Sequence, residues 1–399
     1  MPRATHSRLF RRKPQRKLIP IYAATLLLVF HSFVVAYSNS SFLEQFVSAA
    51  AVGTIYTIGS AVSVLIFLFV SRVLQAVGNF KLTMGLLLTN FVAVLGMAYA
   101  ETLPVAIPLF LIHITTVPLI IFNLDVFMEE EIGNDESGTG TKRGLLLTLA
   151  SLVGAISPLL GGILIGSNDN DLSFVYLISA LTLIPIAFIL LGFLNNFSDP
   201  KYSEIDLFHA IHTFWQNVNI KSVFIAHFLL QMFFTAMVIY TPLYLTGIIG
   251  LSWTEFGVIM FFAQMAYVLL EYPIGILADN YIGEKEMMVT GFFIIAIATS
   301  WMSFVTVSSV LVWSIIMFIT RVGAALVEVT TESYFFKQTK SSDAQIISFF
   351  RLTRPLAIVT GTLIGSLALL YLPFNLIFIV FAALMVPAMF YTLNITDSR

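Results

Sequence analysis

The positive charges of this chain lie in every second loop between long apolar segments, and this alternation constrains the fold more than any other feature. The loops in between contain no lysine or arginine, and one cation, Arg321, falls inside an apolar segment. The cations outside it include Arg11, Arg12, Lys13, Arg16, Lys17, Arg72, Lys81, Lys142, Arg143, Lys201, Lys221, Lys285, Lys337, Lys340, Arg351, Arg354 and Arg399. Short loops that retain cations stay in the cytoplasm. We therefore expect an even number of membrane spans, with both termini in the cytoplasm.

The composition excludes a water-soluble globular protein. The 399 residues are 58% hydrophobic and only 11% charged, which leaves too little polar surface to cover a soluble core. A bilayer core of about 30 Å needs about 20 apolar residues per helix. On that length the sequence predicts twelve spans, at residues 20–38, 46–71, 82–100, 105–127, 144–166, 172–194, 222–245, 254–278, 287–305, 309–332, 352–371 and 374–392. The expected fold class is an all-α membrane protein.

Two polar stretches set the expected domain boundaries. They give a cytoplasmic basic arm at 1–19, an amino-terminal six-helix bundle at 20–194, a cytoplasmic linker at 195–221 and a carboxyl-terminal six-helix bundle at 222–399. The apolar segment after the arm lacks a small-residue cleavage site, so we interpret it as a retained span. His209 and His212 in the linker have the spacing of metal ligands, but no third ligand accompanies them, so we expect no metal site.

The two halves of the sequence resemble each other at an offset of about 200 residues, as in transporters built from repeats. An acidic pair four residues apart ends spans 4 and 10, a glycine and a lysine follow spans 2 and 8, and an arginine opens spans 5 and 11. The corresponding residues are Asp125 and Glu129 with Glu328 and Glu332, Gly78 and Lys81 with Gly283 and Lys285, and Arg143 with Arg351. The repeat predicts two pseudo-symmetric six-helix bundles.

The most specific motif runs from Gly275 through Asp279 and Gly283 to Lys285, at the end of span 8. We expect Gly275 to allow the close approach of a neighbouring backbone and Gly283 to allow a tight reversal. The motif resembles the signature loop of the major facilitator superfamily. That resemblance covers the whole chain and implies the fold of that family, in which two bundles rock about a central cavity lined by spans 1, 4, 7 and 10.

In that family the acid of the motif latches the cytoplasmic side of the protein in the outward-facing state. The resemblance therefore implies a latch between Asp279 and the start of span 5, where Lys142, Arg143 and a positive helix end coincide. In the amino-terminal half, Val70 and Leu74 occupy the places of the first glycine and the acid. We therefore expect a single latch at the cytoplasmic gate, which comprises Gly275, Asp279, Gly283, Lys142 and Arg143.

Span 5 contains Ser157-Pro158-Leu-Leu-Gly161-Gly162 after Gly144. This segment resembles the antiporter motif of the drug–proton exchangers in the same family. The match is partial, because Val153 and Ser157 replace glycines. Small residues around a proline also suit any tight contact between helices, so both interpretations stay open.

Ionisable residues inside the spans are the candidates for coupling. An unpaired charge there costs several kcal/mol, in order of magnitude, so each one needs a partner or a function. Arg321 lies near the middle of span 10 and would bind an anionic or polar substrate group, help a carboxyl to release its proton, or form a structural ion pair. Glu328 lies about 10 Å further along the same helix, too far for direct contact with Arg321. Glu271 and Glu328 are candidates for proton carriage, but a carboxyl permanently paired at the cytoplasmic gate explains Glu328 equally well. Asp125 is either a third candidate or a gate or helix-end contact.

Uncharged polar residues on the same helices complete the expected substrate cavity. His31, His113 and Gln231 fall on spans 1, 4 and 7, and Gln264 falls on span 8. His227 accompanies Gln231, while Tyr267, Tyr56 and Thr57 could add hydrogen bonds and Asn90 has a structural interpretation. A single membrane histidine is as easily explained by packing. The candidate cavity residues are His31, His113, Gln231, Gln264 and Arg321.

These residues predict a secondary active transporter that moves a small organic solute by alternating access. Proton-coupled export by antiport is the first expectation. Proton-coupled uptake of a polar or anionic metabolite is the alternative, and a receptor, lipid scramblase or scaffold with the same fold is a third. The chain has no cysteine, no phosphate-binding glycine loop and no hydrolase or zinc-protease motif. We expect a monomer in the cell membrane, with a solute, protons and lipid as partners and no enzyme activity, cofactor, metal or nucleic acid.

Overall fold

The computed structural model describes residues 18–132, 136–168, 171–202, 215–338, 350 and 352–396, without the side chains of residues 132, 136–144, 279, 280 and 336. In this part of the chain all regular structure is helical. Twelve stretches are long and apolar enough to cross a membrane, at 18–36, 49–77, 79–97, 103–131, 145–166, 173–193, 218–248, 253–278, 284–302, 310–335, 353–371 and 374–393. The expected twelve-span, all-α fold is confirmed.

Each predicted span corresponds to one helix or to a run of consecutive helices. Those of the amino-terminal half are α1 (Leu18–Ala36), α3 (Ala49–Val77), α4 (Asn79–Met97), α5 (Leu103–Ile132), α6 (Glu136–Gly166) and α7 (Ser173–Phe193). Those of the carboxyl-terminal half are α9 (Val218–Pro242) with η1 (Leu243–Ile248), α10 (Trp253–Asn280), α11 (Glu284–Met302), α12 (Val310–Gln338), α14 (Thr353–Tyr371), and η2 (Phe374–Leu376) with α15 (Ile377–Ala383) and α16 (Met385–Leu393). A short helix, α2 (Ser38–Glu44), follows α1. Helices suit a lipid environment because they satisfy their backbone hydrogen bonds internally.

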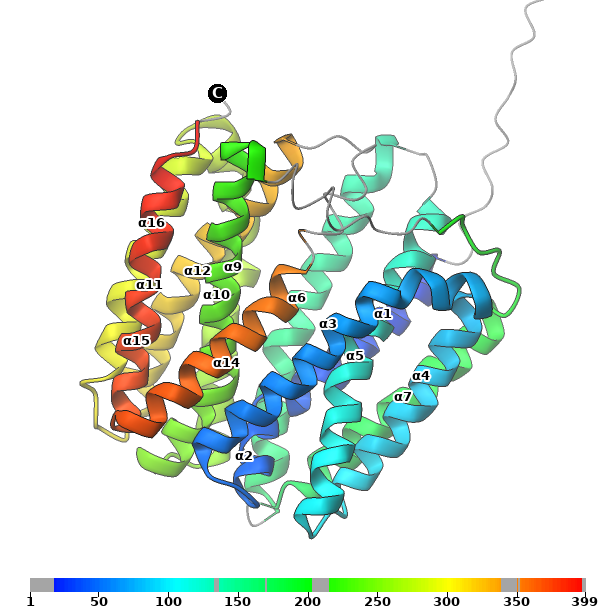
Figure 1. Cartoon of the computed structure of the whole chain (residues 1–399), viewed down its shortest axis with the longest axis horizontal. Helices are drawn as coiled ribbons and strands as arrows, with labels where there is room; N and C mark the ends of the chain where they lie inside the picture. The colour runs from blue at the N-terminus through cyan, green and yellow to red at the C-terminus, as the bar shows by residue number, and fades with distance from the viewer. Residues whose placement is uncertain are drawn as a thin grey trace, which may run out of the picture.

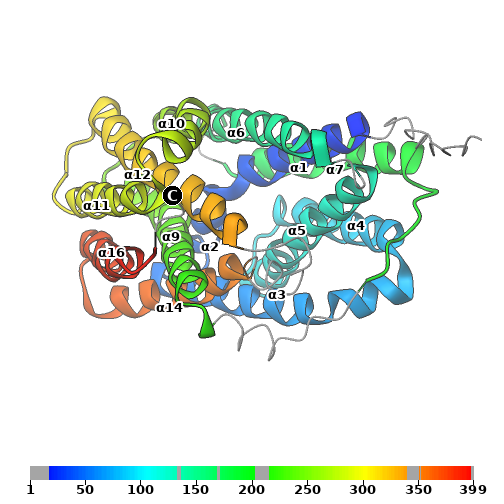
Figure 2. The same cartoon turned by 90° about the horizontal axis from the view of Figure 1, so that it is seen from above.

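The helices form two groups that lie side by side (Figures 1 and 2). In the first group α1 packs on α5, α6 and α7, while α4 packs on α5 and α7. In the second group α12 packs on α9, α10 and α11, while α14 packs on α9. The two groups meet mainly where α6 packs along α10 and α3 along α14. This is the expected pair of six-helix bundles.

Two glycines make the corresponding tight turns of the two halves. Gly78 separates α3 from α4 with φ of 86°, and Gly283 separates α10 from α11 with φ of 95°. Residues with a side chain rarely adopt such angles, so glycine suits both positions. The two turns lie at the end of the molecule where residues 199–202 and the carboxyl-terminal residues also lie (Figure 1), which we call the linker face. The other end, which carries α2, is the opposite face.

The two halves are packed together most closely toward the opposite face. A buried apolar cluster there contains Tyr37 and Val52 from the first half and Tyr240 and Phe256 from the second. Toward the linker face, which is drawn at the top of Figure 1, the helices of the two halves lean apart. The halves still touch there, because Phe67 of α3 packs against an apolar cluster of the carboxyl-terminal half. This state is therefore closed at the opposite face.

Candidate functional site

The polar residues of the first half form a buried network that joins four helices. Asn90 of α4 lies between the two histidines: its Nδ2 is 2.9 Å from His31 Nε2 and its Oδ1 is 2.9 Å from His113 Nδ1. His31 Nδ1 is 2.8 Å from the backbone oxygen of Ser179 on α7. The exposed fractions of His31, Asn90, His113 and Ser179 range from 0% to 4%. The network holds α1, α4, α5 and α7 together inside the amino-terminal half.

The network also assigns the tautomers of both histidines. A backbone oxygen can only accept, so the Nδ1–H of His31 donates to Ser179, and His31 Nε2 accepts from the amide of Asn90. Asn90 Oδ1 then accepts from the Nδ1–H of His113. Within the described residues no hydrogen bond joins this network to Arg321 or to the acidic residues of the second half. The described hydrogen bonds of His31 and His113 thus stay within the amino-terminal half, and the cavity expected to join them to Arg321 stays a prediction.

Arg321 is the most unusual residue of the second half. Its exposed fraction is 2%, and its guanidinium carbon lies 5.5 Å from the centre of the Phe233 ring on α9. Its Nη1 is buried without a hydrogen-bond partner among the described residues. A buried unpartnered donor costs about 1–3 kcal/mol, and more if it is charged. The arrangement therefore leaves a cationic N–H group available to a ligand oxygen.

The acidic residues lie around this arginine. Glu328, further along α12, is attracted by Arg321 and by Arg354 at the start of α14, and it is repelled by Glu271 of α10 and Glu332 of α12. Glu271 and Glu328 are both partly buried. Glu271 also faces the other half, because Ser151 Oγ of α6 lies 3.5 and 3.4 Å from its two carboxylate oxygens. The structure thus brings together Glu271, Arg321 and Glu328, and it adds Glu332, Arg354 and Ser151, which the sequence analysis did not select.

Asp125 stands apart from this cluster. It is exposed on α5 and takes part in an interaction of its own. The acidic pair of the first half is therefore not buried as Glu328 is. This placement matches the helix-end interpretation more closely than proton carriage.

The amide and hydroxyl groups of α9 and α10 lie beside the charged cluster. Gln231 Nε2 is 3.3 Å from His227 Nε2, and His227 Nδ1 is 3.4 Å from the hydroxyl of Thr331 on α12. Gln264 Oε1 and the hydroxyl of Tyr267 are buried without partners in the described part of the chain. Tyr267 lies within electrostatic range of Arg321, Glu328 and Glu271. Tyr267 thus carries a hydroxyl within electrostatic range of the arginine and without a described partner, and Gln264 carries an unpartnered amide oxygen on the same helix.

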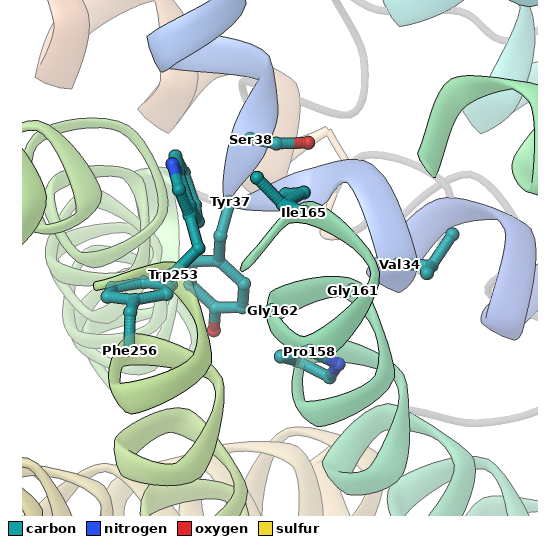
Figure 3. Close-up of a pocket in the computed structure, with 9 residues that line it drawn as sticks. All are labelled: Val34, Tyr37, Ser38, Pro158, Gly161, Gly162, Ile165, Trp253 and Phe256. Carbon is teal, nitrogen blue, oxygen red and sulfur yellow. The ribbon is translucent and has the colours of Figure 1, made fainter. Parts of the chain in front are cut away.

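The small residues of α6 pack between two other helices. A Cβ on Gly161 would lie 2.6 Å from the backbone oxygen of Val34 on α1, and a Cβ on Gly162 would lie 2.9 Å from Cα of Gly257 on α10. Pro158, Gly161 and Gly162 line a small pocket at the opposite face together with residues of α1, α2 and α10 (Figure 3). The other pocket residues are Val34, Tyr37, Ser38, Ile165, Trp253 and Phe256. Tight helix contact therefore accounts for these glycines.

The signature loop is only partly within the described residues. Gly283 makes the expected tight turn, but a Cβ on Gly275 would meet no atom within 4 Å. The expectation that Gly275 allows a close backbone approach is wrong for this state, because no atom of the described residues lies within 4 Å of the position that its Cβ would take. The side chains of Lys142, Arg143 and Asp279 lie outside the described residues, as do His209 and His212 of the linker and the basic arm up to Lys17.

In the first half, an acidic residue that the sequence analysis did not select contacts the turn between α3 and α4. Asp199, at the start of the linker, accepts a hydrogen bond of 2.8 Å from the backbone N–H of Asn79 and one of 2.6 Å from the hydroxyl of Tyr202. Burial, followed by this hydrogen bond, raises the pKa of Tyr202 above its usual value. Leu74, in the position of the missing acid, is buried. Asp199 thus supplies the negative charge that the first loop lacks at the start of α4.

Comparison with known proteins agrees with this architecture. Residues 223–398 match the family model described as the Major Facilitator Superfamily. Comparison with curated protein sequences gives no match. The fold resembles the nucleoside transporter NupG, with a TM-score of 0.74 and 11% identity over 94% of this chain and 98% of that one.

Two further solved structures have the same fold. The POT family transporter PepTSo has a TM-score of 0.75 and 10% identity over 96% of this chain and 98% of that one. A bacterial homolog of the human lysosomal transporter Spinster, crystallised in an inward-facing and unoccupied conformation, has a TM-score of 0.74 and 11% identity over 96% and 97% of the two chains.

The fold and the twelve apolar helices define a multi-pass helical membrane protein with the fold of the solved transporters named above. More specifically, residues 223–398 match the major facilitator superfamily, and nearly the whole chain has the fold of the solved transporters that it resembles. The family and the similar structures are transporters and not enzymes. The drug–proton antiporter subtype is not confirmed.

Proposed function

We propose that this protein couples the movement of a small organic solute to protons, and that Glu271 and Glu328 carry the proton. The observation that supports this most is that Glu328 lies within electrostatic range of both Glu271 and the buried Arg321 inside the carboxyl-terminal half. A protonated carboxyl is neutral and can be buried without an ionic partner, whereas the ionised form needs one. Loss or gain of one proton would therefore change which arrangement of the cluster is stable.

The same change in protonation would drive alternating access between two states of the protein. Gain of a proton removes one negative charge from the cluster, and a ligand or proton that prefers one arrangement shifts the population toward it. A shift from 1:99 to 99:1 needs a preference of about 5.5 kcal/mol. Several charges within range of Glu328 are a suitable source for a difference of that size. This state, which is closed at the opposite face, would be one of the two.

Two observations bear on the direction of transport, and they favour opposite directions. The partial exporter motif of α6 favours antiport, which we retain as the first proposal. Its glycines are, however, also explained by packing against α1 and α10. Arg321, whose Nη1 has no hydrogen-bond partner among the described residues and whose charge acts on Tyr267, favours uptake of a polar or anionic solute by symport. That solute class is the second proposal.

For the other candidate residues we propose different roles. Gln231 and Gln264 would contact the solute, since they lie on the two helices that pack around Arg321. His31 and His113 would hold the amino-terminal half together, because their described hydrogen bonds run to Asn90 and Ser179. Asp125 would act at a helix end.

We also propose the cytoplasmic latch between Asp279 and Arg143. Its support is the register of α6 against α10: Gly166 meets Thr254, Gly162 meets Gly257 and Ser151 meets Glu271. Arg143 lies eight residues before Ser151, and Asp279 lies eight residues after Glu271. Continuation of this register brings the two residues to the same level at the linker face. The alternation of positive charge supports a cytoplasmic position for that face.

Proteoliposomes that contain a pH-sensitive dye test the proposal. A thermal-shift screen of solutes on the purified protein first identifies a ligand, and its addition should then change the internal pH. Glu271→Gln and Glu328→Gln should abolish that change, while Glu286→Gln, at an exposed position on α11, should retain it. Solute movement without proton movement in the unaltered protein would disprove coupling. Binding without solute movement would instead indicate a receptor or scaffold.

A further inference from the structure

The α6–α10 seam, where one helix from each half packs along the other, contains both a close crossing and a polar contact. Near the opposite face the backbones of Gly162 and Gly257 touch without side chains between them. Further toward the linker face, the hydroxyl of Ser151 points at the carboxylate of Glu271. Among the hydrogen bonds that cross the seam in the described part of the chain, the one between Ser151 and Glu271 involves an ionisable side chain. A movement of one half against the other must change it.

The contact between Ser151 and Glu271 is long in this state. Its two distances of 3.5 and 3.4 Å exceed the usual length of about 2.7 Å for a bond between a hydroxyl and an oxygen acceptor. The other ionisable groups around Glu271 are Glu328 and Glu332 on α12 and Tyr267 on its own helix, while the cations Arg321 and Arg354 of the same cluster act on Glu328. The two glutamates oppose ionisation of Glu271. Ser151 is thus the neighbour that can stabilise the ionised form by donating a hydrogen bond.

Ser151 lies eleven residues from Gly162 along α6, a lever of about 16 Å at a rise of about 1.5 Å per residue. If the halves rock about the glycine crossing, a rotation of about 3° moves Ser151 by about 0.8 Å relative to Glu271. Such a rotation toward closure of the linker face would shorten the contact to the usual length. A similar rotation the other way would break it. The contact therefore responds to very small changes in the angle between the halves.

We propose that Ser151 is a positioning residue for proton coupling, which makes ionised Glu271 favour the arrangement with a closed linker face. The inference rests on the proposed proton-carrying role of Glu271. When Glu271 loses its proton, its carboxylate gains most from Ser151 if the linker face closes. When Glu271 is protonated, that advantage is largely lost, and the open linker face is no longer disfavoured. The hydroxyl of Ser151 in the first half thus couples the protonation of Glu271 in the second half to the angle between the two halves.

Pulsed electron paramagnetic resonance on the full-length protein in lipid nanodiscs measures this angle without a substrate. Spin labels at Lys81→Cys and Glu286→Cys report the distance across the linker face, and both positions are exposed. The natural chain has no cysteine, so no background labelling has to be removed. The short-distance population should grow as the pH rises. In Ser151→Ala the midpoint of that change should move by about half a pH unit to higher pH, a threefold change in the proton equilibrium.

Two variants on α6 are matched controls. Ser151→Thr keeps the hydroxyl and should restore the midpoint of the unaltered protein. Ser157→Ala removes a hydroxyl that is bonded to the backbone of its own helix, at Val153, and should leave the midpoint unchanged. In a Glu271→Gln background, Ser151→Ala should have no further effect. These variants separate the hydrogen bond from a general change in helix packing.

The outcomes distinguish the inference from the function on which it rests. If Glu271→Gln abolishes the pH response while Ser151→Ala leaves the midpoint in place, Ser151 has no positioning role and the proposed function stands. If Ser151→Ala has the same effect with and without Glu271, it acts through another group and the inference is wrong. If Glu271→Gln changes neither the pH response nor proton movement in proteoliposomes, the proton-carrying role of Glu271 itself is refuted.

Discussion

Gly162 of α6 and Gly257 of α10 face each other across the two halves with no side chain between them. A Cβ on Gly257 would lie 3.2 Å from Cα of Gly162 and 2.8 Å from the backbone oxygen of Pro158. Backbone atoms cannot move aside as a flexible side chain can, so any larger residue must push the helices apart. Closure of the opposite face in this state therefore depends on these two glycines.

We predict that Gly257→Ala opens the opposite face. Overpacking costs about 1–3 kcal/mol, and about 1.4 kcal/mol corresponds to a tenfold change in population. A cysteine at Ser38, a buried residue of the adjacent pocket (Figure 3), should react roughly tenfold faster with an impermeant maleimide in this variant. Gly85→Ala on α4 is the control, because a Cβ there meets no atom within 4 Å. Equal labelling rates in both variants would show that the crossing does not control access.

The histidine network makes a prediction about stability rather than transport. Asn90→Leu removes the partner of both His31 Nε2 and His113 Nδ1, which leaves two buried polar atoms unsatisfied. Each should cost about 1–3 kcal/mol of the free energy of unfolding. Unfolding of the detergent-solubilised protein by dodecyl sulfate measures the loss. The neighbouring Thr89→Ala, which removes an exposed hydroxyl bonded to its own helix, should change stability much less. A stability equal to that of Thr89→Ala would contradict this role.

The number and position of the spans could be predicted because each segment carries a strong signal of its own. Twelve apolar segments separated by short polar turns leave little choice in a bilayer of fixed thickness. The turn glycines Gly78 and Gly283 were also predictable, since each stands between two apolar runs and precedes a lysine. The burial of Arg321 follows from its place near the middle of an apolar helix. These features depend on local sequence.

The orientation of the polar side chains could not be predicted in the same way. His31 and His113 lie on helices that are apolar on all sides, so no pattern indicated that both side chains meet Asn90 rather than the second half. Gly275 seemed suited to a close helix contact, yet a Cβ there meets no atom of the described residues within 4 Å. Ser151 is one serine among many in the spans. Its significance comes from the register of two helices in different halves, which no local pattern contains.

The contact made by Asp199 could not be predicted from local sequence either, and it gives a third testable prediction. Asp199 lies far from Asn79 in the sequence, but its carboxylate caps the start of α4. Asp199→Ala should cost about 0.5–2 kcal/mol, as for other residues at helix starts. Hydrogen exchange of the backbone amides of residues 79–82 should accelerate, and the effect should stay within this turn. Ser198→Ala, at the adjacent exposed position, is the control. Unchanged exchange in Asp199→Ala would mean that the contact does not stabilise α4.

Arg321 gives the sharpest prediction about the solute. Its guanidinium combines a position beside the Phe233 ring with an unpartnered Nη1. A lysine would keep the charge but would lose the planar group and its directed donors. For a polar or anionic solute held by this side chain, Arg321→Lys should lower the apparent affinity at least about tenfold, which corresponds to about 1.4 kcal/mol. Transport rates in proteoliposomes, measured over a range of solute concentrations, give this affinity.

Arg72→Lys provides a control with the same chemical change. Its guanidinium carbon lies 5.9 Å from the centre of the Phe69 ring, but the residue is exposed near the end of α3 and lies outside the charged cluster. Any general effect of the replacement on expression or folding should appear in both variants, whereas a loss of solute binding should appear only in Arg321→Lys. Equal affinities would assign Arg321 to the structure of the carboxyl-terminal half. The solute would then have to be held by Gln231, Gln264 or Tyr267, and the symport proposal would lose its support.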